Sequence, residues 1–171
     1  MIPLKKLVEL KDSVLIKNND SLKKDLLFDV VKKIMNVESI SNRTNLNDYK
    51  NYVEIRKRSI DELVYAYKSI SNTFDIKYVE IIYDVLVIVK LYDINLIRSS
   101  NTWMVSENFK LKTNLFNIIK ELFNKSYDID TNIIYVLNQL IYLGELNNVD
   151  IETILKMKIE YENNIEFLEN H

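Results

Sequence analysis

The sequence predicts an all-α bundle of six or seven helices that forms a single domain over residues 1–171. Two observations favour this fold class. Apolar residues recur at intervals of three and four rather than in alternation, and the 171 residues include one Gly and one Pro, which leaves few sharp turns. Hydrophobic residues make up 47% of the chain, which is enough to bury a core.

Polar breaks divide the chain into segments of helical spacing. Ser21 is a suitable N-cap for the second helix, and residues 39–47 are the most loop-like segment. Asp75 and Ser106 are suitable N-caps for the fourth and fifth helices. The predicted helices cover about residues 4–16, 22–34, 48–69, 78–92, 109–122 and 129–144, with the last beginning near residue 150.

Two segments carry further local signals. Residues 78–92 are apolar nearly all round, which is typical of the central helix of a bundle. Their β-branched residues also permit a strand, but the length of the run and its helical neighbours favour a helix. The sixth helix follows Asp128 and meets Gly144, the only glycine, which is well suited to a left-handed C-terminal cap.

The scarce residue types exclude several kinds of site. One glycine cannot build the Gly-rich loops that hold dinucleotides or triphosphates. The chain has no Cys, which excludes disulfides, thiolate zinc sites and a cysteine nucleophile. The only His is His171, the last residue, where packing cannot readily hold it. Any chemistry must therefore come from carboxylates, Lys, Ser, Tyr or a hard metal ion with oxygen ligands.

Charge and hydropathy set expectations about partners and location. The formal net charge of −2 argues against a dedicated nucleic-acid binder, although Arg56-Lys57-Arg58 is a basic run. The most apolar stretch, residues 81–91, is interrupted by charge and is shorter than the roughly 20 residues that span a bilayer. Residues 1–11 offer no uncharged segment for a secretory signal. We expect a cytoplasmic protein without a membrane helix.

Two carboxylates on the predicted central helix are the sharpest local signal. Glu80 and Asp84 are four residues apart, so they share one face of an otherwise apolar helix. Burying carboxylates costs several kcal/mol unless a cation or hydrogen bonds compensate. Mg²⁺ could supply that compensation, and Glu62 on the preceding helix could join Asp84 around the same ion.

Ion pairing is the alternative explanation for these carboxylates. Glu80 and Asp84 could pair with Lys77, Arg98 or Lys68, or could line a solvated edge of the helix. Elsewhere, Lys158 lies near an apolar stripe, where its amine could reach water or an anion.

The order of segments resembles the all-α NTP pyrophosphatases, specifically the dimeric dUTPase branch related to the MazG-like proteins. The resemblance begins with Leu4-Lys-Lys-Leu-Val-Glu-Leu10, and residues 59–69 and 77–96 resemble that family's two metal-binding helices. It continues over residues 109–166, while residues 17–50 do not align. In the family, Glu-x-x-Glu on one helix and Glu-x-x-Asp on the next bind Mg²⁺ and activate water.

The resemblance implies particular site residues. Ser59 and Glu62 align with the first acidic pair, and Ile81 and Asp84 with the second, so two of the four ligands are retained. It therefore assigns catalytic roles to Glu62 and Asp84 and makes them metal ligands. Glu80 is a third candidate metal ligand, although it stands one residue early and about 100° away around the helix.

The phosphate-binding motif of the family is also incomplete. Of the family's Lys-Asn-x-x-Asn-x-x-Arg pattern, the resemblance leaves Lys158 as the phosphate-binding residue. Glu162 replaces an asparagine, which would place negative charge near a bound triphosphate.

Three functions stay open on this basis. The resemblance implies a homodimeric, Mg²⁺-dependent enzyme that converts dUTP to dUMP and pyrophosphate. Loss of Glu at Ser59 and Ile81 favours instead a catalytically inactive dUTPase-like protein that acts by nucleotide or protein binding. The third alternative is an unrelated helical interaction protein whose apolar stripes engage a partner helix.

Overall fold

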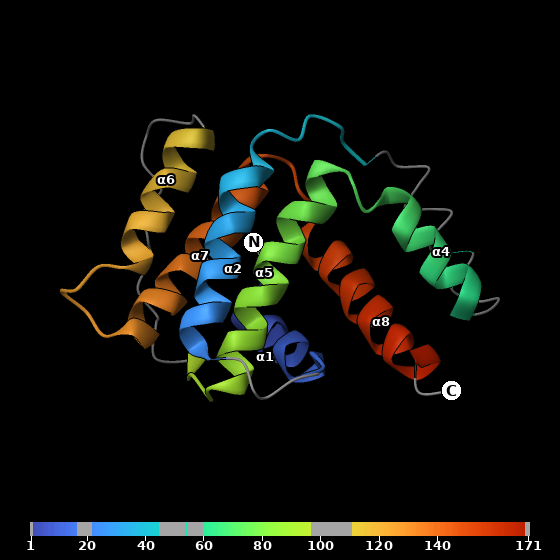
Figure 1. Ribbon diagram of the computed structural model, residues 1–171, viewed down its shortest axis with the longest axis horizontal. Helices are drawn as coiled ribbons and strands as arrows, with labels where there is room; N and C mark the ends of the chain where they lie inside the picture. The colour runs from blue at the N-terminus through green and yellow to red at the C-terminus, as the bar shows by residue number, and fades with distance from the viewer. Residues whose placement is uncertain (1, 17–21, 45–53, 55–59, 97–110, 170–171) are drawn as a thin grey trace.

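The computed structural model describes residues 2–16, 22–44, 54, 60–96 and 111–169, and in these residues it contains seven α-helices and no strand (Figure 1). The all-α prediction is confirmed for this part of the chain. The helices are α1 (Leu4–Ser13), α2 (Lys23–Val37), α4 (Ile60–Ile70), α5 (Phe74–Leu91), α6 (Leu111–Leu122), α7 (Ile129–Leu146) and α8 (Ile151–Glu169).

Helix α5 is the centre of the bundle, as its composition predicts. It contacts α1, α2, α7 and α8, and Figure 1 shows it between α2 and α8. Most of its side chains are buried on all sides of the helix, which is why the sequence of this segment lacks a polar face. The half-buried residues of α5 are Lys77, Glu80, Asp84, Val87, Lys90 and Leu91, and the first four form a narrow stripe along it.

The remaining helices cover α5 in two groups. Helix α6 packs on α7, and α2 packs on both α5 and α6. On the other side α8 packs on α5, and α4 lies outermost against α8 (Figure 1). The buried apolar side chains of all these helices form one continuous cluster.

Several predicted helix boundaries agree with the structure. Asp128 directly precedes α7, and its carboxylate accepts a hydrogen bond from the Thr131 N–H at 2.7 Å. Asp150 precedes α8 in the same way and accepts from the Thr153 N–H at 3.3 Å. The predicted caps Ser21 and Ser106 lie outside the described residues, as does most of the predicted helix before residue 60.

The prediction of Asp75 as an N-cap is wrong. The N-cap of α5 is Thr73, and Asp75 lies in the first turn with 4% of its surface exposed. Its carboxylate accepts hydrogen bonds from Arg43 Nε at 2.6 Å and Arg43 Nη2 at 2.9 Å. Asp75 lies two residues after the N-cap position, and its carboxylate accepts from the segment after α2 instead of from the first backbone N–H groups of α5.

The prediction of Gly144 as a left-handed cap is also wrong. Gly144 lies inside α7 with an ordinary backbone conformation, and Asn148 takes the left-handed conformation, with φ 60°. The ring of Tyr78 occupies the space beside Gly144, where an added Cβ would lie 2.6 Å from Tyr78 Cε1. The glycine therefore permits the close approach of α5 to α7 rather than a turn.

No helix among the described residues is both long and apolar enough to cross a membrane. This agrees with the expectation from the sequence, because charged residues interrupt each apolar run.

Candidate functional site

The half-buried stripe of α5 faces side chains from three other helices. Lys33 of α2 and Lys158 of α8 both act electrostatically on Asp84, as does Glu80 one turn before it. We call Lys33, Glu80, Asp84 and Lys158 the Asp84 cluster. The structure therefore brings together three residues that the sequence singles out, and it adds Lys33.

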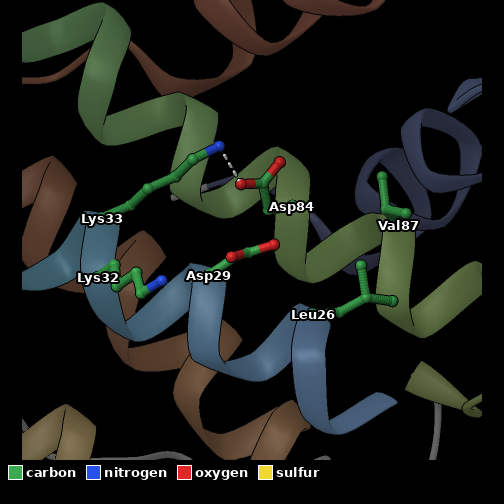
Figure 2. A pocket seen from close by; sticks show the side chains of 6 residues that line it. All are labelled: Leu26, Asp29, Lys32, Lys33, Asp84 and Val87. Atoms are coloured by element: carbon green, nitrogen blue, oxygen red, sulfur yellow. Dashed lines mark hydrogen bonds and ion pairs between the residues drawn. The ribbon is translucent and has the colours of Figure 1, made fainter. Parts of the chain in front are cut away.

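Asp84 forms an ion pair with Lys33 across the α2–α5 interface. The Lys33 Nζ donates to Asp84 Oδ2 at 2.5 Å, and Figure 2 shows the lysine reaching across to the carboxylate. The Asp84 side chain is 26% exposed. Burial raises the pKa of the Asp84 carboxyl above its usual value, although the charges of Lys33 and Lys158 oppose the change. The carboxylate in turn raises the pKa of Lys33, against the opposite effect of burial.

A cavity of about 290 Å³ opens beside this ion pair. Figure 2 shows that α2 and α5 form its walls and that Asp29 of α2 extends toward Asp84. Its charged lining consists of two acids and two lysines, so the cavity carries no strong excess of either charge. The residues that line it are Leu26, Asp29, Lys32, Lys33, Asp84 and Val87.

Glu80 is compensated by α4 and by its own helix. The Tyr67 hydroxyl donates to Glu80 Oε1 at 3.2 Å, and Lys77 Nζ lies 3.7 Å from Glu80 Oε2. The pairing with Lys77 that the sequence suggests is confirmed. Burial and the Glu80 carboxylate raise the pKa of Tyr67, so this hydroxyl keeps its proton and acts as a donor.

Lys158 reaches an anion rather than water, and that anion belongs to its own helix. Its Nζ lies 2.5 Å from Glu162 Oε1, and the side chain is 12% exposed. The rings of Tyr67, Tyr83 and Tyr161 surround the amine, with centroids 5.2 to 5.8 Å away. The residue that the resemblance assigns to phosphate is thus enclosed and already paired.

Glu62 differs from Glu80 and Asp84 in being exposed. It lies in the first turn of α4 and is exposed, whereas the hydrogen bond from α4 to Glu80 comes from Tyr67 further along the helix. Among the described residues, no group of three or more His, Asp or Glu side chains is placed to hold a metal ion. Ser59, the aligned position of the first lost ligand, lies outside them.

The donor set around Asp84 does not fit a hard divalent cation. Such an ion takes about six or more oxygen ligands, some of which can be water molecules, and it is bound through carboxylates whose oxygens are available to it. Here Asp84 has a lysine amine at 2.5 Å, and Glu80 has a tyrosine hydroxyl at 3.2 Å. The side chains of this protein supply the compensation that the sequence analysis assigned to Mg²⁺. The use of Mg²⁺ by this protein stays a prediction.

Lys33 and Tyr67 are members of this site that were not predicted from the sequence. A signal for Lys33 existed, because it stands three residues after Val30 and four before Val37, which are both buried. Those spacings direct Lys33 toward the helix that covers them. Tyr67 is buried, with 1% of its surface exposed.

The raised pKa of Asp84 predicts that the difference in unfolding free energy between the wild type and Asp84→Asn depends on pH. Because the folded-state pKa of Asp84 is raised above its usual 3.8, the folded state binds this proton more tightly than the unfolded state. That contribution is fully present below pH 3.8 and is lost as the pH rises through the folded-state pKa. The wild type should therefore gain stability relative to Asp84→Asn as the pH falls from about 7 to about 4.

Urea denaturation of both proteins at the two pH values measures this difference. Asp25→Asn, which makes the same change at an exposed carboxylate of α2, is the matched control. An equal stability difference between wild type and Asp84→Asn at both pH values would contradict the raised pKa.

Comparison of the chain with protein-family models, curated proteins and solved structures finds no match.

Proposed function

We propose that the chain is a catalytically inactive helical protein of the dUTPase-like type that acts by binding another protein. The observation that carries the proposal is the Lys33–Asp84 ion pair at 2.5 Å. Asp84 is one of the two carboxylates that the resemblance retains for metal-assisted hydrolysis. A carboxylate that is closely paired with a lysine is a poor ligand for a metal ion, since the two cations compete for the same oxygens.

The phosphate-binding part of the site that the resemblance implies supports the same proposal. A triphosphate requires several cationic or N–H donors that are free to meet its charge. Lys158 is 2.5 Å from Glu162, and Lys33 is 2.5 Å from Asp84, so a bound nucleotide would have to break both pairs. This favours protein binding over nucleotide binding as the function of an inactive chain. Large apolar side chains exposed on α2 and α6 favour it independently.

The proposed inactivity predicts that purified protein releases no pyrophosphate above background from dUTP or the other nucleoside triphosphates in the presence of Mg²⁺. The reason is that Asp84 pairs with a lysine and Glu80 accepts a hydrogen bond from a tyrosine, so these two carboxylates do not form an open metal site. A pyrophosphate-release assay checks it, with an active dUTPase as the positive control.

The Glu62→Ala/Asp84→Ala double variant is the matched control. It should behave as the wild type does, within the background of the assay. Mg²⁺-dependent release by the wild type that disappears in the double variant would overturn the proposal, and the preferred triphosphate would then name the substrate. The homodimer that the resemblance implies is a separate proposal, which sedimentation equilibrium tests.

A further inference from the structure

Helix α4 is held at the edge of the bundle by one neighbouring helix. Among the described residues it packs against α8 alone, whereas each of the other six helices packs against two or more. Figure 1 shows α4 at the outer edge of the molecule, beyond α8. Of the α4 side chains that the structure describes, Tyr67 and Ile70 are buried and the others are exposed or half-buried. A helix with so few buried contacts can open locally at a lower free energy than the whole bundle unfolds.

Tyr67 makes the contacts that close α4 over the bundle. Its ring stacks on the ring of Tyr161 of α8, with centroids 4.2 Å apart. Its hydroxyl donates to Glu80 Oε1 of α5 at 3.2 Å. An O–H···O hydrogen bond is ordinarily about 2.7 Å long, so this link between α4 and α5 is a weak one. The stacked ring is therefore the main anchor of the helix.

The start of α5 is fixed without α4. The Phe74 N–H donates to the backbone oxygen of Asn42 at 2.7 Å, and Arg43 of the same segment donates to Asp75 at 2.6 Å. Residues 71 and 72 lie between α4 and this fixed point, and they are half-buried and exposed, respectively. A few residues at the end of an element can absorb the change in backbone dihedral angles when that element swings. Helix α4 can therefore move about residues 71–72 while α5 stays in place.

Lys158 lies beneath the ring of Tyr67. The ring centroid is 5.8 Å from Lys158 Nζ, and the lysine side chain is 12% exposed. The side chain of Glu80, at the other contact of Tyr67, is 13% exposed. When α4 lifts, Tyr67 leaves with it, and the Lys158 amine loses one wall of its enclosure.

We infer that α4 is a lid over Lys158 and Glu80 that opens about residues 71–72 while the other helices stay packed. The closed lid keeps the Lys158 amine away from solutes. In the open state the amine is bordered by the rings of Tyr83 and Tyr161, which stay with the bundle, and it is accessible to an anionic group from outside the chain. The inference concerns access to Lys158 and does not depend on the proposed protein-binding function.

Hydrogen exchange of the full wild-type chain at low urea concentrations tests the opening. The amides of residues 64–70 should have protection factors at least about tenfold below those of residues 133–143 in α7. Their exchange should also depend little on urea, because a local opening exposes little surface. Equal protection and equal urea dependence in α4 and α7 would overturn the inference, since α4 would then open only when the whole bundle unfolds.

Tyr67→Phe removes the hydrogen bond to Glu80 and keeps the stacked ring. It should speed the exchange of residues 64–70 by about fivefold and leave that of α7 unchanged, because the bond is lost from the closed state alone. Tyr65→Phe makes the same change at a side chain of α4 that is 76% exposed, and it should leave both unchanged. If Tyr67→Phe speeds exchange in α7 as much as in α4, or fails to fold, the hydroxyl stabilises the whole bundle and α4 is not a separate lid.

Acetylation by succinimidyl acetate, followed by mass spectrometry, tests what the lid covers. In the wild type Lys158 should react at least about tenfold more slowly than Lys156, which is on the same helix and 49% exposed. In Tyr67→Phe the reaction of Lys158 should accelerate by the same factor as the exchange of α4, because both require the same opening, while that of Lys156 should not change. A constant rate at Lys158 while α4 exchange accelerates would overturn the assignment of Lys158 as the group beneath the lid.

Discussion

Arg43→Ala should lower the free energy of unfolding by about 3 kcal/mol, because it leaves a buried carboxylate without its cation. Asp75 is 4% exposed, and two nitrogens of Arg43 donate to its two oxygens. The same guanidinium donates to the backbone oxygen of Asn147 at 2.9 Å and lies 5.1 Å from the ring of Phe74. One side chain thus joins the segment after α2, the start of α5 and the α7–α8 turn. Urea denaturation at neutral pH measures the loss.

Two further variants distinguish the loss of the Arg43–Asp75 ion pair from the cost of leaving Asp75 buried without a cation. Arg43→Lys keeps the positive charge but loses the paired donors, so it should recover only part of the stability. In Arg43→Met/Asp75→Leu neither a charge nor an unpaired oxygen is left buried, and the loss should be smaller than in Arg43→Ala alone. A double variant that is less stable than Arg43→Ala would contradict this explanation.

Gly144→Ala should destabilise the protein by about 2 kcal/mol, although alanine is normally the better helix former by about 1 kcal/mol. The added Cβ would lie 2.6 Å from Tyr78 Cε1 and 3.0 Å from Ile151 Cδ1. The ring cannot move aside freely, because the Tyr78 hydroxyl donates to the backbone oxygen of Leu140 at 2.5 Å. Tyr78 is fully buried, and the surrounding side chains leave it little other space. Thermal denaturation followed by circular dichroism measures the change.

The sign of this effect should reverse when the ring is removed. In the Tyr78→Leu background the Cβ no longer meets an aromatic ring, so Gly144→Ala should be neutral or stabilising by up to about 1 kcal/mol. Tyr78→Phe keeps the ring and should retain the penalty. If Gly144→Ala stabilises the otherwise wild-type chain, the close approach of Tyr78 is not the reason for the glycine.

Features that depend on residues close together in the sequence could be predicted, whereas contacts between residues far apart in the sequence could not. Helix positions follow from apolar spacing and from Asp128, because a helix and its cap are decided within a few residues. The Lys77–Glu80 pair was foreseen for the same reason, as the two residues are three apart on one helix.

Contacts between residues far apart in the sequence could not be predicted. Lys33 and Asp84 are 51 positions apart, and Arg43 and Asp75 are 32 apart. Gly144 lies within α7 and is not its cap, and its role depends on Tyr78 of another helix. No periodicity within one helix specifies which residue of another helix will face it, so the partners of Asp84 and Asp75 required the three-dimensional structure.

The central position of α5 has a consequence for how the chain folds during synthesis. Helices α1 and α2 leave the ribosome before α5, yet both pack against it, and α5 ends at Leu91. Their apolar faces stay unburied until that segment emerges, whereas α6 and α7 are neighbours in sequence and can pair as soon as both are made. The helices after α5 then meet a surface that the earlier half has already begun to assemble. Among the described helices, the segment that completes the packing of α1 and α2 is thus also the segment on which α7 and α8 pack.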